Sequence, residues 1–164
     1  DGSIMFNDTN DTNQRGIIRY DHTTDALRFH TSNGELVALD GTKVGIGTTN
    51  PKGDVDIGEQ FSITTTTTAV STTAATTIDT LAIATYRSSR FQVQITQGTD
   101  YQSADLMVIH DGTTASIIEY GSIATNNMLA SFTSTISGSN LLLQANMGSS
   151  TSATVKVVRY GISV

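Results

Sequence analysis

The sequence contains no cysteine and no tryptophan, and it has a single proline among 164 residues. The lack of cysteine excludes disulfide bonds and thiolate metal sites, and it leaves the redox compartment open. Charged residues make up 15% of the chain and apolar residues 37%, and both fractions are low for a cytosolic enzyme. Thr, Ser, Asn and Gly fill the gap, which favours extended β-structure with many turns.

Positive charge is also scarce, and the net charge is −6. The basic residues are scattered along the chain, so no basic stripe is available for a phosphate backbone, and we expect no nucleic-acid partner. No apolar run approaches membrane-spanning length, and the opening DGSIMFNDTND does not look like a signal peptide, so we expect no membrane insertion. The lack of an initiator methionine suggests a fragment or a processed chain.

Residues 1–58 contain short apolar segments such as GIIRYDH, ALRFHT and ELVALD, separated by turn formers. The alternation around Arg28 places Leu27 and Phe29 on one face of a strand and Arg28 on the other. Strands this short bury little surface by themselves, so a lone sheet of this kind would be marginally stable. Identical neighbouring chains are the simplest source of the missing apolar surface.

The segment FSITTTTTAVSTTAATTIDT, residues 61–80, admits three interpretations: a glycosylated stalk, a flexible linker or a strand. It lacks the prolines of a mucin-like stalk. Because threonine is β-branched and stiff at χ1, it favours an extended backbone, and we predict a strand here.

From about residue 77 the pattern of strands becomes regular. FQVQITQ alternates cleanly, with Phe91, Val93 and Ile95 on one face, and VKVVRY places Val155, Val157 and Arg159 on one face. Asp111-Gly112 and Ser137-Gly138 lie between apolar segments and predict tight hairpin turns. Seven or eight short strands with glycine-bearing turns predict an antiparallel β-sandwich or jelly roll.

The segment VGIGTTNP contains a GxG but no phosphate-binding loop. A dinucleotide fingerprint needs a third glycine where Asn50 stands, and a P-loop needs a Gly-Lys-Ser/Thr ending that is absent. Glycines beside valine and isoleucine fit a place where backbones approach closely, as on a crowded three-fold axis. The sequence also has no G-x-S-x-G elbow. We therefore expect no enzymatic activity, no catalytic residue and no cofactor.

Three kinds of side chain are candidates for binding. His22 and His30 are candidate metal ligands if copies converge on an axis, although a surface histidine is the default and no metal site is predicted. Asp105 and Glu119 flank a hairpin as a pair of carboxylates, without other support for glycoside hydrolysis. Tyr86, Tyr101 and Tyr120 are candidate glycan contacts, as is Tyr160 in a similar position, and packing of these rings at a sandwich edge is the alternative.

The segments GIIRYDHTTDALRFHT and LDGTKVGIGTTNP resemble phage tail-fibre and related virion appendage proteins. In those proteins the pattern G-x-I-x-Y-D-H, L-x-F-x-T and V-G-I-G-T-T-x-P recurs along the fibre. The segment YRSSRFQVQITQGTDYQSADLMVIHDGTTASIIEYGSI is similar to C-terminal domains of structural proteins from contractile-tailed phages of marine cyanobacteria. These resemblances imply an elongated homotrimer with chains interwoven in its N-terminal part and a β-sandwich knob at its C-terminus.

We therefore expect an all-β protein with an interwoven trimeric β-shaft over residues 1–58 and an antiparallel, jelly-roll-like β-sandwich head over residues 59–164. The predicted trimer core is Ile18, Leu27, Phe29, Val44 and Ile46. The expected function is that of a structural subunit of an extracellular virion appendage, a tail fibre or related fibre used in host attachment. Its expected partners are sister copies, other virion proteins and a host surface glycan. The alternatives are a lectin-like carbohydrate-binding module and a capsid or collar decoration protein with no receptor role.

Overall fold

A computed structural model describes residues 2–6, 16–31 and 34–164. All secondary-structure elements in these ranges are β-strands, which confirms the all-β prediction. No helix in the described ranges is long and apolar enough to cross a membrane. The chain divides into two compact units, which we call the N-terminal unit (residues 1–63) and the C-terminal unit (residues 64–164).

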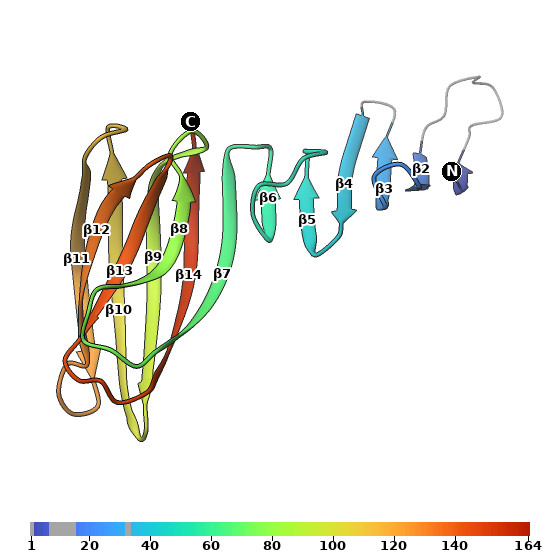
Figure 1. Cartoon of the computed structure of the whole chain (residues 1–164). Coiled ribbons are helices and arrows are strands. Elements are labelled where there is room, and N and C mark those ends of the chain that lie inside the picture. The colour runs from blue at the N-terminus through green and yellow to red at the C-terminus, as the bar shows by residue number, and fades with distance from the viewer. Residues whose placement is uncertain (1, 7–15, 32–33) are drawn as a thin grey trace. The chain divides into compact units, whose positions relative to one another are not determined.

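The N-terminal unit is a succession of short strands, each paired with the next along the chain (Figure 1). All of these pairs are antiparallel except β5 with β6, which is parallel. The strands β1 to β6 are three to seven residues long, which agrees with the spacing of Gly, Asn and Asp along the sequence. The strands are β1 (Gly2–Phe6), β2 (Gly16–Asp21), β3 (Ala26–Thr31), β4 (Gly34–Asp40), β5 (Lys43–Ile46), β6 (Val55–Ile57) and the first residues of β7 (Phe61–Val70).

The loop after VGIG explains why glycine is needed there. A Cβ on Gly45 would lie 2.6 Å from the carbonyl oxygen of Thr48, and Gly47 has a φ of +69°, which favours glycine. The buried carboxylate of Asp56 accepts hydrogen bonds from the backbone N–H groups of Lys52 (2.9 Å) and Glu59 (3.0 Å). The glycines predicted a close approach of two backbones, as on a three-fold axis. In the structure the close approach is between Gly45 and Thr48 of the same chain, in the loop that brings β6 back parallel to β5.

The C-terminal unit consists of two sheets packed face to face. The large sheet has the order β7-β14-β9-β10-β11, and the small sheet has the order β12-β13-β8. The apolar core between them draws on both sheets, from Phe91, Val93 and Ile95 on β9 to Leu141 and Leu143 on β13. The strands that follow β7 are β8 (Thr76–Ala82), β9 (Tyr86–Gln97), β10 (Asp100–His110), β11 (Ala115–Ala124), β12 (Ala130–Ser137), β13 (Asn140–Met147) and β14 (Ala153–Ser163).

Several sequence predictions for this unit are confirmed. Val155, Val157 and Arg159 are all buried on one face of β14. The predicted hairpin turns have Gly112 at φ +106° and Gly138 at φ +58°. The threonine-rich segment is extended, as predicted, but it forms two strands, β7 and β8, which belong to different sheets of the sandwich.

Two buried polar groups tie the sandwich together. The side chain of Gln102 accepts hydrogen bonds from the N–H groups of Leu129 and Ala130 and donates to Ser122 Oγ, which holds the start of β12 beside β10. Between the sheets, Arg159 Nη1 donates to Asp79 Oδ2 at 2.7 Å, and its guanidinium lies over the ring of Tyr86. Burial raises the pKa of Asp79, and the neighbouring Arg159 opposes that rise.

Candidate assembly face and candidate binding hollow

One face of the N-terminal sheet carries two unbroken rows of apolar side chains, which we call the apolar face. Because directly paired residues on neighbouring strands project to the same side of a sheet, the strand register defines these rows. The first row is Ile4, Ile18, Phe29, Val37, Ile46, Ile57 and Phe61, and the second is Tyr20, Leu27, Leu39, Val44, Val55 and Ile63. All five residues of the predicted trimer core lie on this face.

The apolar face remains accessible to solvent in the single chain. Ile4 is 61% exposed, Ile57 46% and Ile46 39%. Among the described residues of the N-terminal unit, the buried apolar side chains are those of Ala26, Ala38 and Pro51. Both alanines are on the opposite face, one position from Leu27 and Leu39 respectively. The larger apolar side chains of this unit therefore have no closed interior within the chain.

The opposite face of the same sheet is mixed and includes Met5 and Ile17, but its central row is small or polar and is better covered than the apolar rows. Its central row includes Arg28, Ala38, Gly45, Asp56 and Ser62, all of which are buried. Arg28 Nη2 donates to Thr24 Oγ1 (2.9 Å), and the loop of residues 47–54 approaches Gly45 closely. Along this central row, the polar side of the sheet is therefore buried, while the apolar side is half-buried or exposed.

The two histidine candidates are not brought together within one chain. His22 is exposed at the end of β2 and packs edge-on against the ring of Tyr20, at a centroid distance of 4.7 Å. His30 is on β3 opposite Ile17, several residues along the strand from the turn that holds His22. Among the described residues, no group of three or more His, Cys, Asp or Glu side chains could hold a metal ion.

The tyrosine candidates differ in accessibility. Tyr86 is 4% exposed and belongs to the sandwich core, so its ring is not available to a ligand in this structure. Tyr101 and Tyr120 are exposed on β10 and β11. Tyr160 lines a concavity on the outer face of the large sheet, together with residues that the sequence did not single out as a group.

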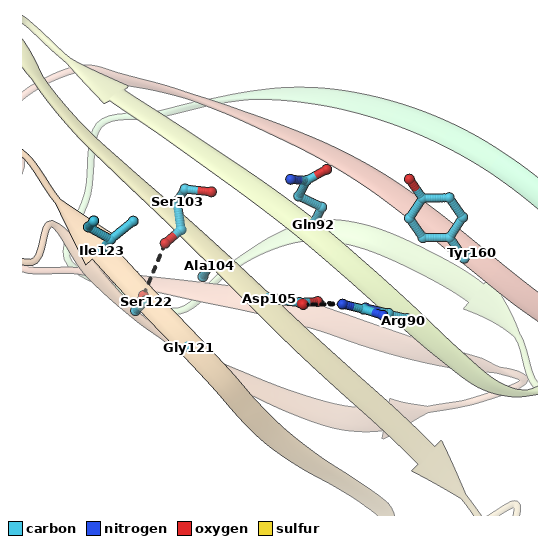
Figure 2. Close-up of a pocket in the computed structure, with 9 residues that line it drawn as sticks. All are labelled: Arg90, Gln92, Ser103, Ala104, Asp105, Gly121, Ser122, Ile123 and Tyr160. Atoms are coloured by element: carbon cyan, nitrogen blue, oxygen red, sulfur yellow. Dashed lines mark hydrogen bonds and ion pairs between the residues drawn. The ribbon is translucent and has the colours of Figure 1, made fainter.

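That concavity, which we call the hollow, has a volume of about 750 Å³. It spans β14, β9, β10 and β11, and the side chains of Arg90, Gln92, Asp105 and Tyr160 project into it from the face of the sheet that is turned away from the core (Figure 2). The hollow is lined by Arg90, Gln92, Ser103, Ala104, Asp105, Gly121, Ser122, Ile123 and Tyr160. Gly121, which pairs with Asp105, leaves space on this face, because a Cβ there would meet nothing within 4 Å.

An ion pair occupies one side of the hollow. Arg90 Nε donates to Asp105 Oδ1 at 2.9 Å, and Arg90 Nη2 donates to Asp105 Oδ2 in a second, parallel bond. This bidentate pairing lowers the pKa of Asp105 and raises the pKa of Arg90, so both groups remain charged. Figure 2 shows the two side chains pointing at one another. Asp105 is thus paired with Arg90 on β9.

Sequence reasoning missed the ion pair, although one signal for it was present. Arg90 stands at an outward position of the alternation that buries Phe91 and Val93, and Asp105 stands at an outward position of the next strand. Whether the two meet depends on the register of β9 against β10, which places Asp105 opposite Gln92 and diagonal to Arg90.

No protein-family model and no curated protein sequence matches this chain. Among solved structures, the chain is similar to a tailspike protein of Acinetobacter baumannii phage AM24, with a TM-score of 0.44 and 9% sequence identity over 65% of this chain. It is also similar to the tailspike protein of Acinetobacter phage vB_ApiP_P1, with a TM-score of 0.36 and 22% identity over 60% of this chain. The matches span 27% and 20% of those two tailspike chains, respectively.

Proposed function

We propose that this chain is a structural subunit of a phage tail appendage, a tail fibre or related fibre. Three copies assemble through the apolar face of the N-terminal unit, and the C-terminal unit forms the head that attaches to the host. The observation that carries this proposal is the apolar face itself. It is continuous across seven strands, and no charged residue interrupts its two rows.

The energetics favour sister copies as the cover for this face. Burying a Val, Leu, Ile or Phe side chain fully stabilises a fold by about 1.5–3 kcal/mol, and the N-terminal unit forgoes part of that gain while it is alone, because the side chains of the two rows are only half-buried or exposed. Sister copies bring the same apolar rows, so association can bury all of them at once. Interfaces that form permanently are apolar and poor in charge, as this face is. The number three comes from the resemblance of GIIRYDH and VGIGTTNP to fibre motifs.

The C-terminal unit supports a head role because it closes an apolar core of its own between its two sheets. We propose no enzymatic activity for it. The bidentate bond from Arg90 lowers the pKa of Asp105, whereas a general acid at neutral pH needs a raised pKa. On this proposal the chain works in the extracellular virion, together with other virion proteins.

The test is light scattering of the purified full chain after size-exclusion chromatography. The proposal predicts a mass of three times the 17.4 kDa subunit that persists on dilution, because subunit exchange would be slow. A stable 17.4 kDa monomer with the full β-sheet circular-dichroism signal would overturn the proposal, since the apolar face would then need no cover.

A further inference from the structure

We propose that the hollow on the outer face of the large sheet binds a neutral sugar ring, the terminal contact of the head with a host-surface glycan. This inference rests on the attachment role proposed above and names the ligand class and the residues that hold it. It starts from the shape of the sheet. The outer face is hollowed beside a bulge between Asp105 and Leu106, which shifts the register of β10 against β11, and Gly121 stands directly opposite Asp105.

The charges in the hollow argue for a neutral ligand. Arg90 and Asp105 form two parallel hydrogen bonds, so the guanidinium charge is balanced at the place where a ligand would bind. An anionic group such as a phosphate or a uronic acid would approach Arg90 only beside the Asp105 carboxylate and would be repelled by it. The pair keeps hydrogen-bonding capacity, because a guanidinium has five N–H donors and each carboxylate oxygen has two lone pairs.

The other lining groups suit a polyhydroxylated ring. The amide of Gln92 offers both donors and an acceptor, and the side chain of Ser103 can donate or accept, which matches hydroxyl groups that do both. Tyr160, the direct cross-strand neighbour of Arg90, adds a ring with an apolar face and a polar tip. Ile123, which is 73% exposed, adds apolar surface on the side of β11. Sugar rings present both kinds of surface.

The hollow is also held rigidly, which lowers the entropic cost of binding. Ser122 accepts a hydrogen bond from Gln102 Nε2 (3.1 Å) on its core-facing side, and its hydroxyl donates to the carbonyl oxygen of Ser103 (3.4 Å). Figure 2 shows this second bond between β11 and β10. Since Gln102 is 2% exposed and also bonded to the backbone at Leu129 and Ala130, the strand beside Gly121 is fixed from beneath.

The test uses the full chain on an array of neutral and acidic bacterial-surface glycans, with the variant Gly121→Leu. A Cβ at this position meets nothing within 4 Å and the backbone needs no unusual φ, so we expect a leucine side chain to extend into the hollow and leave the fold intact. Ser116→Leu is the matched control, because it adds the same side chain to an exposed position of the same strand outside the hollow. We expect neutral glycans to bind the wild type and Ser116→Leu, and binding by Gly121→Leu to be at least about tenfold weaker, a loss of about 1.4 kcal/mol.

A second variant tests the charge argument. Asp105→Ser leaves the Arg90 guanidinium without its carboxylate, so binding should shift from neutral toward acidic glycans. The inference is overturned if the wild type binds no neutral glycan, if it prefers acidic glycans, or if Gly121→Leu binds as the wild type does. Circular dichroism and light scattering on the same samples separate the two proposals. A trimer without glycan binding contradicts this inference alone, and a monomer that binds glycan contradicts the proposed assembly alone.

Discussion

The two units of this chain are built from similar strands and differ in what covers their apolar faces. In the C-terminal unit, the small sheet of β8, β12 and β13 covers the large sheet, and Phe91, Val93 and Ile95 are completely buried. In the N-terminal unit, Ile18, Phe29 and Ile46 stand in a similar apolar row, but Ile18 and Phe29 are only half-buried and Ile46 is exposed. The alternation of side chains is alike, so the difference lies in the presence of a second layer.

This comparison shows that the alternation of side chains along a strand determines which face of the sheet is apolar, but does not determine what buries that face. A sheet with one apolar face is incomplete until that face is buried, whether by the same chain or by another. The C-terminal unit uses three strands as its cover. The N-terminal unit uses its loop of residues 47–54 on the polar side and keeps the apolar side for sister copies, on the function proposed here.

The largest expected effect comes from placing a charge on the apolar face. Phe29→Asp would put a carboxylate in the middle of the first row, and burying an unpaired charge costs far more than a single apolar contact contributes. We expect the scattering mass to fall from three subunits to 17.4 kDa while the C-terminal unit keeps its β-sheet signal. Ser3→Asp, an exposed position on the opposite face, should leave the mass unchanged. If Phe29→Asp remains a trimer, the assembly face lies elsewhere.

The second largest effect is expected from a substitution in the core of the C-terminal unit, away from the apolar face. Arg159→Met removes the partner of the buried Asp79, and breaking a buried pair typically lowers the free energy of unfolding by about 3–5 kcal/mol. The double variant Arg159→Met, Asp79→Leu should regain most of that loss, because no buried charge is then left alone. Urea unfolding measures both, and scattering should show an unchanged mass. A double variant as unstable as the single one would argue against this account.

The loss of unfolding free energy in Arg159→Met should also depend on pH, and the pKa of Asp79 determines the direction. Burial raises the pKa of Asp79, so without Arg159 the charged carboxylate is costly above that pKa, and the cost disappears below the unfolded-state value. The destabilisation should therefore shrink as the solution is acidified toward about pH 4. A loss that is constant with pH would show that altered packing around the substituted side chain, and not the charge of Asp79, causes it.

We expect a smaller difference in stability between alanine substitutions at one glycine of each unit. Gly45→Ala places a Cβ 2.6 Å from the carbonyl oxygen of Thr48, so backbone must move, and overpacking of this kind costs roughly 1–3 kcal/mol. Gly121→Ala meets nothing within 4 Å and should change stability by less than about 0.5 kcal/mol. Thermal unfolding of the two variants measures the contrast. Equal midpoints for both would mean that the loop after Gly45 is free to move away.

The sequence predicted the strands well and the pairings poorly, for a physical reason. Alternation within one segment, as in Phe91, Val93 and Ile95, depends on neighbours two residues apart and can be read directly. The hairpin turns at Gly112 and Gly138 depend on local backbone conformation and were also predicted. The division of the threonine-rich segment between two sheets depends on which strands its two halves pair with, and the sequence of the segment itself contains no information about those partners.

The candidate sites follow the same rule. Five residues of the apolar face were predicted one at a time, and the register then aligned three of them, Ile18, Phe29 and Ile46, into a single row. The hollow was not foreseen, because it needs Arg90, Asp105 and Gly121 from three strands and a bulge that shifts one of them. Tyr86 was named for its chemistry, but its burial follows from the packing of the two sheets.

The smallest expected effect concerns a single turn of the C-terminal unit. Hydrogen bonds from the backbone N–H groups of Thr114 and Thr113, and then from the Thr113 hydroxyl, lower the pKa of Asp111 to about 2. A lowered folded-state pKa means that the carboxylate stabilises the turn above its unfolded-state pKa, and that this stabilisation is lost as the pH falls from about 4 toward 2. The amide NMR signals of Thr113 and Thr114 should therefore shift with a midpoint near about pH 2. In Asp111→Asn, whose side-chain oxygen can still accept those bonds but does not titrate, the shift should vanish. A midpoint of about pH 4 in the unmodified chain would show that these hydrogen bonds do not favour the charged carboxylate. Neither result bears on the proposed assembly through the apolar face.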